Sequence, residues 1–295
     1  MDFPRHGCRV SPRALDEDDV RLRPGRSKSR PRSKDRPAHA EAQTGMVTTV
    51  DRGRFSVLMD ADMPVFAIKA RELGRKGIVV GDVVDIVGDV TGDSDTQGRI
   101  VRRHERSSVL RRTADDDDPV ERVVVANATQ LAIVTAAANP EPRLGLIDRA
   151  LVAAYDAGIE PMLIITKTDL GSPDLLVRTY APLDIPIFLG RDKLAPAGLH
   201  ERLVGHSTVL LGHSGVGKST LVNGLLPEAH RLTGAVNDIT GKGRHTSTSV
   251  IAMPLPHGGW IIDTPGIRSF GLAHVTHLDV LLARVKGERD DPELD

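Results

Sequence analysis

Three short motifs, each placed directly after an apolar run, constrain the fold of this 295-residue chain more than any other feature. In chain order they are TKTD at Thr166–Asp169, GHSGVGKS at Gly212–Ser219 and DTPG at Asp263–Gly266. Short apolar runs that alternate with helical segments are typical of buried parallel strands, and the loops after such strands meet at one edge of the sheet. The sequence therefore predicts a doubly wound α/β sheet that carries all three motifs at one ligand-binding edge.

The middle motif is the most specific of the three. It follows the apolar run Thr208–Leu211 and precedes the helical run Thr220–Leu226, which is the context that a phosphate-binding loop requires. Glycines let backbone N–H groups approach phosphate oxygens, Lys218 is placed to reach the β- and γ-phosphates, and the Ser219 hydroxyl is placed to ligate Mg²⁺. The residues predicted to bind phosphate are Gly212, His213, Ser214, Gly215, Val216, Gly217, Lys218, Ser219 and Thr220. A glycine-rich turn without a ligand is the alternative.

The two flanking motifs supply the other parts of a nucleotide site. Asp263 ends an apolar run and is predicted to face Mg²⁺, and the N–H of Gly266 is predicted to reach the γ-phosphate. Within Thr166-Lys167-Thr168-Asp169, the carboxylate can accept two hydrogen bonds from guanine while the lysine stem lies across the base. Adenine lacks that donor pair, so the motif favours GTP. Thr166 stands where Asn is usual, and a hydroxyl cannot duplicate the paired donor and acceptor of an amide.

The order of the motifs is unusual. A GTPase ordinarily places its phosphate loop first and its base-reading motif last, whereas here the base-reading motif comes first. If the three motifs meet in space, the chain is a circularly permuted P-loop GTPase. A general ATPase is a further alternative, which would be excluded if ATP failed to compete with GTP.

The residues before this region predict a small β-barrel. Five β-rich or alternating runs separated by Gly, Asp and Pro are Met46–Val50, Arg54–Met59, Val65–Ala70, Val83–Val87 and Gly98–Arg103. Five short strands favour an OB-fold, which commonly binds oligonucleotides. Basic residues that could contact RNA phosphates are Arg52, Arg54, Arg71, Arg75 and Lys76. A β-module that only packs against its neighbour is the alternative.

A basic segment precedes the barrel. Between Arg21 and Arg36 there are eight basic residues and one acid, with few apolar residues to form a core. This composition predicts a disordered arm with an attraction for RNA, or a solvated tail that aids solubility. We therefore predict an arm at 1–44, an OB-fold at 45–107, a linker at 108–121, a GTPase domain at 122–272 and a short tail at 273–295.

Composition excludes several classes of protein. Cys8 is the only cysteine, so neither an internal disulfide nor a cysteine zinc cluster is expected. No apolar stretch approaches the roughly 18 residues of a membrane span, and the charged N-terminus lacks the apolar region of a secretory signal. We expect a cytoplasmic monomer with no membrane partner.

The chain resembles the bacterial ribosome small-subunit-dependent GTPase A (RsgA) family over about residues 45–272. The resemblance rests on the permuted motif order, the preceding barrel, and the strings GHSGVGKST, GRHTST and DTPGIRSFGL. It implies an OB-fold before a circularly permuted GTPase domain, and GTP hydrolysis stimulated by the small ribosomal subunit during its late maturation. The implied partners are that subunit, its rRNA, and GTP or GDP.

The resemblance also implies a first switch at Leu232–Ser249. Thr246 or Thr248 would supply a hydroxyl to Mg²⁺, with Thr246 favoured. Because an isoleucine follows Gly266 where many GTPases carry a water-orienting Gln, the resemblance implies that His245 contacts the attacking water. A surface histidine is the alternative. The magnesium ligands implied in this way are Ser219, Thr246 and Asp263.

Two features of the family are missing. Gly190-Arg191-Asp192 stands where a Ser-Ala loop usually contacts the base. The chain reaches Asp295 without a second cysteine, so the family's C-terminal zinc domain is expected to be absent and no zinc site is predicted. Without that domain, an RNA-binding module that senses the GTP/GDP ratio with little hydrolysis is the alternative function.

Overall fold

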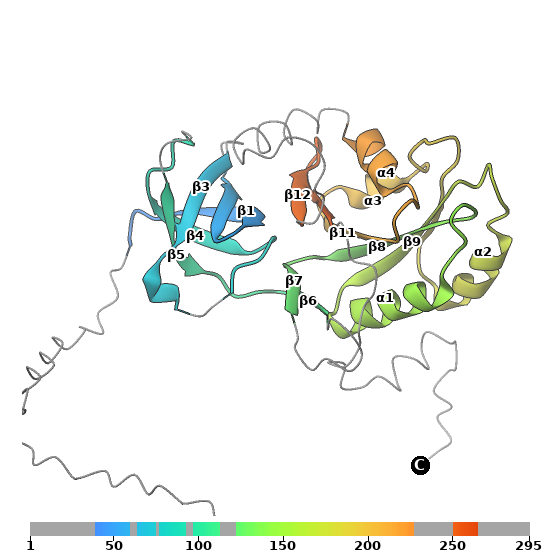
Figure 1. Ribbon diagram of the computed structural model, residues 1–295, viewed down its shortest axis with the longest axis horizontal. Helices are drawn as coiled ribbons and strands as arrows, with labels where there is room; N and C mark the ends of the chain where they lie inside the picture. The colour runs from blue at the N-terminus through green and yellow to red at the C-terminus, as the bar shows by residue number, and fades with distance from the viewer. Residues whose placement is uncertain are drawn as a thin grey trace, which may run out of the picture. The chain divides into compact units, whose positions relative to one another are not determined.

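A computed structural model describes residues 39–59, 64–74, 77–92, 97–112, 122–226 and 250–264 of the chain (Figure 1). All of these residues belong to one compact unit. The predicted arm lies outside them up to residue 38, but Gln43 and Thr44, which we assigned to the arm, are already part of the first strand.

In the described part of the chain, five strands close into a small barrel. They are β1 (Gln43–Asp51), β2 (Arg54–Leu58), β3 (Pro64–Lys69), β4 (Val83–Gly88) and β5 (Gly98–Arg103), with a 3₁₀ turn at Arg71–Leu73. The order β1-β2-β3-β5-β4 closes because β1 also pairs with β4, and only β3 and β5 are parallel. Val47, Val57 and Ile86 are fully buried in its core. This is the predicted five-stranded OB-fold barrel.

Six further strands form a mostly parallel arrangement. They are β8 (Gln130–Ala136), β9 (Glu160–Thr166), β10 (Ile187–Leu189), β11 (Ser207–Leu211), β12 (Ile251–Pro254) and β13 (Trp260–Asp263). Their order is β10-β9-β8-β11-β13-β12, and only β12 runs antiparallel to its neighbour β13. The strand β12 was not predicted, whereas β11 begins one residue before the apolar run Thr208–Leu211 that was expected to precede the phosphate loop.

Helices cover both faces of this sheet (Figure 1). Those described are α1 (Leu144–Asp156), α2 (Asp174–Tyr180), α3 (Leu199–Leu203) and α4 (Lys218–Leu225). Alternate residues of β8 point to opposite faces, so Ile133 packs in the cluster that contains α1 and α2, and Val134 in the cluster that contains α3 and α4. Both faces are therefore buried, which explains why β8 is a continuous apolar run rather than an alternating one.

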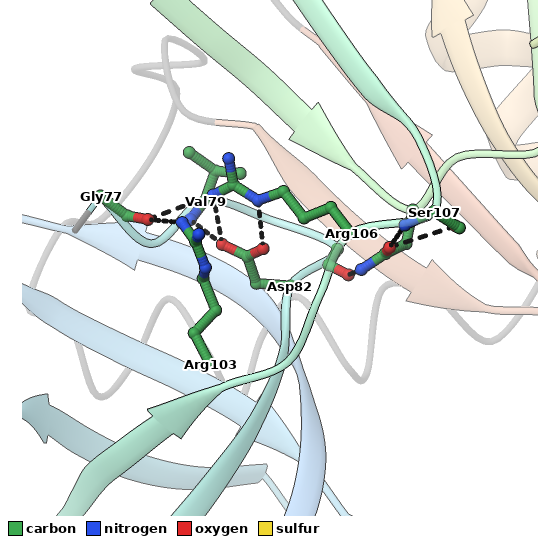
Figure 2. A network of polar contacts seen from close by, with 8 residues as sticks. Gly77, Val79, Asp82, Arg103, Arg106 and Ser107 are labelled. Carbon is green, nitrogen blue, oxygen red and sulfur yellow. Dashed lines mark hydrogen bonds and ion pairs between the residues drawn. The ribbon is translucent and has the colours of Figure 1, made fainter. Parts of the chain in front are cut away.

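A hairpin follows the barrel strands in the chain, and a buried ion pair holds the loop before this hairpin against the turn that precedes β4. The hairpin pairs β6 (Val109–Arg112) with β7 (Arg122–Ala126), so the predicted linker begins with a strand. Asp82 is fully buried and accepts hydrogen bonds from Nε and Nη2 of Arg106 at 2.7 and 2.8 Å and from the Val79 N–H at 2.8 Å (Figure 2). A buried charge needs such pairing. Gly81 packs so closely that a Cβ there would lie 2.0 Å from the Ala126 carbonyl oxygen.

Candidate nucleotide-binding site

The described parts of the three motifs meet at one edge of the sheet. β9 ends at Thr166, β11 leads into Gly212, and β13 ends at Asp263. The parallel register aligns these ends, because Ala136 is paired with Thr166 and Leu210 with Asp263. The predicted site residues His245, Thr246 and Gly266, and the alternative Thr248, lie outside the described residues.

The phosphate loop has a backbone that requires glycine. A Cβ on Gly212 would lie 2.3 Å from the Val134 carbonyl oxygen, so no larger residue fits there. Gly215 and Gly217 have φ of 82° and 98°, which side chains disfavour. Val216 between them is buried and anchors the loop in the core, and α4 begins directly after Gly217. A glycine loop that opens a helix is a ready-made anion site.

A lysine at the start of α4 and an aspartate at the end of β13 form the centre of the site. Lys218 Nζ donates to the carbonyl oxygens of Gly212 and, at 3.2 Å, of His213. Burial lowers the pKa of Lys218, while the nearby Asp263 carboxylate raises it. Burial raises the pKa of Asp263, against the opposing effects of Lys218 and the Thr264 backbone N–H. Both charges are thus incompletely compensated by the described residues.

The surroundings of Asp263 fit a divalent cation. Its Oδ1 atom is buried and has no hydrogen-bond partner among the described residues. A buried carboxylate oxygen without a partner is costly, and Mg²⁺ prefers such ligands. Ser219, the other described residue predicted to ligate Mg²⁺, is exposed on the first turn of α4.

Thr264 is a residue whose role the motifs did not indicate. It is buried, and its hydroxyl donates a 2.7 Å hydrogen bond to the Leu210 carbonyl oxygen on β11. This bond fixes the chain immediately after Asp263 against the neighbouring strand.

The base-reading motif is held by main-chain contacts. The Thr166 hydroxyl lies 2.5 Å from the Val216 carbonyl oxygen and 3.2 Å from that of Thr135. Lys167 has a φ of 56°. Its Nζ donates hydrogen bonds to the Gly215 carbonyl oxygen at 2.9 Å and to the Asn139 carbonyl oxygen. The first two residues of this motif therefore contact the phosphate loop.

Two loops complete the site, and neither was identified from the motifs as part of it. The Gly190 carbonyl accepts hydrogen bonds from the N–H and hydroxyl of Thr168 at 3.1 and 3.2 Å. The Asp192 N–H donates to Asp169 Oδ1 at 3.2 Å, so Gly190-Arg191-Asp192 lies where a base-contacting loop belongs despite lacking Ser-Ala. The second loop follows β8 and supplies the Asn139 carbonyl that Lys167 contacts. No local pattern marks either loop, because both act through the backbone.

A family model described as RsgA GTPase matches residues 103–273. The chain belongs to the RsgA GTPase family. Small ribosomal subunit biogenesis GTPase RsgA from Ectopseudomonas mendocina is 40% identical over 239 residues, which cover 73% of this chain and 68% of that protein. The protein of the same name from Pseudomonas syringae pv. syringae is 37% identical over 236 residues, with the same coverage.

Solved structures agree with this membership. YjeQ from Thermotoga maritima is 27% identical, with a TM-score of 0.57, and the match covers 77% of this chain and 75% of that one. YloQ, described as a circularly permuted GTPase, is 22% identical, with a TM-score of 0.59 over 86% of this chain and 81% of that one. The predicted permuted GTPase fold after an OB-fold barrel is therefore confirmed. As an RsgA GTPase, the protein is a GTP hydrolase.

Neither a membrane-spanning helix nor a cluster of metal ligands is present among the described residues. None of the helices there is both long and apolar enough to cross a membrane. Within the same residues, no three or more His, Cys, Asp or Glu side chains are grouped so that they could hold a metal ion. Cys8 and the predicted tail at 273–295 lie outside the residues described, so the expected absence of zinc stays a prediction.

Proposed function

We propose that this RsgA GTPase acts in biogenesis of the small ribosomal subunit, binding that subunit late in its maturation and hydrolysing GTP in response. The observation that carries the proposal is the meeting of Lys218, Asp263 and the base-reading motif on one sheet edge of a permuted GTPase. The names of the relatives support the ribosomal part. Such a role belongs in the cytoplasm, where ribosomes are assembled.

Different residues of the proposed site bind the base, the phosphates and Mg²⁺ and contact the attacking water. Asp169 accepts hydrogen bonds from guanine, the loop from Gly212 surrounds the phosphates with N–H groups, and Lys218 contacts the β- and γ-phosphates. Asp263, Ser219 and Thr246 or Thr248 would hold Mg²⁺, which neutralises charge on the phosphate oxygens when bound. We assign the contact with the attacking water to His245 and the γ-phosphate N–H to Gly266.

We propose that exposed arginines of the barrel bind rRNA phosphates. Exposed arginines lie on β2 and β5 and in the turns next to β1 and β3, and they are Arg52, Arg54, Arg71, Arg99 and Arg102. Such side chains bind phosphates without reading sequence, so affinity for rRNA should fall steeply with salt. Arg75 and Lys76, which we also predicted to contact RNA, lie outside the described residues.

GTP turnover with and without purified small subunits tests the proposal. We expect a large stimulation by the subunit, and its loss in Lys218→Ala. We expect the His245→Ala variant to turn over GTP more slowly and to bind GTP with unchanged affinity. If the variant binds GTP more weakly but hydrolyses bound GTP at the normal single-turnover rate, His245 is not catalytic. Subunit binding without turnover would support the nucleotide-sensing alternative, and competition by ATP would indicate an ATPase.

A further inference from the structure

Four polar side chains meet on the outside of the barrel, where the strands β1, β4 and β5 are neighbours. The strand register places Thr44 opposite Asp85, and Asp85 opposite Arg102. His104 follows the end of β5 and continues its pairing, because the His104 N–H donates to the Val83 carbonyl oxygen at 2.9 Å. Residues two positions apart in an extended chain face the same side. Arg102 and His104 therefore both lie beside Asp85.

Asp85 is the centre of these contacts, and its side chain is only 7% exposed. Its Oδ1 accepts hydrogen bonds from the Thr44 hydroxyl at 2.8 Å and from His104 Nε2 at 2.7 Å, and its Oδ2 forms an ion pair with Arg102 Nη1 at 3.1 Å. Burial acts to raise the pKa of Asp85, but the hydrogen bonds from His104 and Thr44 and the charges of His104 and Arg102 lower it overall. The carboxylate is therefore ionised at neutral pH. Because an ionised carboxylate can only accept, His104 Nε2 carries the proton of this bond.

Arg102 and His104 are held by Asp85 and remain accessible to a ligand. Their side chains are 60% and 41% exposed. Among the described residues, Nε and Nη2 of Arg102 and Nδ1 of His104 make no further polar contact. Alternate residues of a strand are about 7 Å apart, so one phosphate group can contact both side chains. The barrel therefore presents two nitrogen donors whose orientation a buried carboxylate already fixes.

Protonation of His104 decides the charge of this group of side chains. Arg102 and Asp85 carry opposite charges, so the group is neutral with a neutral imidazole and has a single positive charge with a protonated one. When Nε2 of the neutral ring donates to Asp85, Nδ1 is an acceptor and repels a phosphate oxygen. Protonation turns Nδ1 into a donor. Glu105, which is exposed and follows His104 in the chain, is a further titratable group beside it.

We infer that Arg102 and His104 form a binding site for a backbone phosphate of RNA, ordered in advance by Asp85, and that RNA binding there takes up a proton at His104. This inference rests on the proposed function, in which the barrel binds rRNA. Arg99 on the same strand is exposed and has no polar partner among the described residues. A ligand has to order such a side chain at a cost in entropy, whereas Asp85 already orders Arg102. Arg102 should therefore contribute more to RNA binding than Arg99.

Binding of the full chain to purified small ribosomal subunits tests the inference, with the protein fluorescently labelled and a non-hydrolysable GTP analogue present. Arg102→Gln should bind about tenfold more weakly, which is the effect of losing a hydrogen bond between charged groups. Arg99→Gln removes the same charge from the same strand and is the matched control. It should bind less than about fivefold more weakly. Equal losses in the two variants would overturn the inference, because the contact with Asp85 would then add nothing.

The pH dependence of the same binding tests the part of His104. Lowering the pH from about 8 to about 6 should tighten binding of the unchanged protein, because histidine gains its proton in this range. His104→Gln keeps a donor for Asp85 and should respond less. The same response in both proteins would assign the proton uptake elsewhere and remove His104 from the site. Unfolding midpoints show that the variants are folded, and failure of the unchanged protein to bind the subunit would instead contradict the proposed function.

Discussion

The phosphate side and the base side of the site are built on different principles. On the phosphate side, the partly buried Lys218 and Asp263 have pKa values that burial displaces, and one Asp263 oxygen has no partner among the described residues. On the base side, Asp169 is exposed and already held by the Asp192 N–H. In the proposed site, the phosphate side therefore leaves charge for a ligand to compensate, whereas the base side is already held by a backbone contact.

The comparison predicts the largest loss for Lys218→Ala. A hydrogen bond to a charged group contributes about 1.5 to 3 kcal/mol, so GTP should bind roughly 10- to 150-fold more weakly. Isothermal titration calorimetry with GTP and Mg²⁺ would measure the change. Lys193→Ala removes an exposed lysine from the loop after β10 and is the matched control. Equal losses in the two variants would contradict the assigned role of Lys218.

On the base side, Asp169→Asn should change selectivity rather than abolish binding. An amide offers one donor and one acceptor, which suits xanthine better than guanine. We expect GTP to bind about tenfold more weakly and XTP correspondingly more tightly. Competition between the two nucleotides measures the ratio. If the variant binds both GTP and XTP more weakly, the Asp169 carboxylate acts on the structure of the surrounding loop instead.

Ligand binding on the phosphate side should depend on pH through Asp263. Because burial raises the pKa of this carboxyl, it becomes protonated at a higher pH than usual and can then no longer ligate Mg²⁺. Mg²⁺-dependent GTP affinity should fall as the pH falls through the raised pKa, by at most about tenfold per pH unit. Asp263→Asn should bind weakly with no such dependence, and a wild-type profile in that variant would assign the titration elsewhere.

The unfolding free energy of the ligand-free protein should depend on pH in the opposite direction to GTP affinity. Between the unfolded pKa near 3.8 and the raised folded value, the folded state binds more protons at Asp263 than the unfolded state does. The contribution of this carboxyl to stability is therefore present at low pH and is lost as the pH rises. The measurement is the difference in unfolding free energy between the protein and Asp263→Asn. A difference that is constant with pH would exclude this linkage.

The smallest expected effect concerns Thr264. Thr264→Val removes the hydrogen bond to the Leu210 carbonyl and should lower the unfolding free energy by about 1 kcal/mol. Chemical denaturation would measure it. Thr179→Val, which removes an exposed hydroxyl that donates to the Leu175 carbonyl oxygen on α2, is the control. If Thr264→Val remains folded but hydrolyses GTP more slowly, the bond also sets the path of the DTPG segment.

The same comparison explains what could be predicted from sequence. Gly212 and Lys218 could be assigned to the proposed site because a phosphate loop imposes residue types at fixed local spacing, and Asp263 because it ends an apolar run. Thr166 and Val216, which contact each other, are 50 positions apart in the sequence. Asn139, Gly190 and Asp192 contact the base-reading motif through their backbone atoms. Any residue type supplies a carbonyl or an N–H, so such contacts leave no pattern in the sequence. For the same reason, β12 and β6 were not predicted, since their strand character comes from pairing with neighbours.

The two-point contact between β9 and the phosphate loop has a consequence for synthesis of the chain. Thr166 and Lys167 precede their acceptors Val216 and Gly215 by 50 and 48 residues. Chains emerge from the ribosome N-terminus first, so β8, β9 and β10 are made before the loop exists. In this permuted GTPase the phosphate loop therefore reaches strands that are already synthesised, and β13, which carries Asp263, is made after the loop.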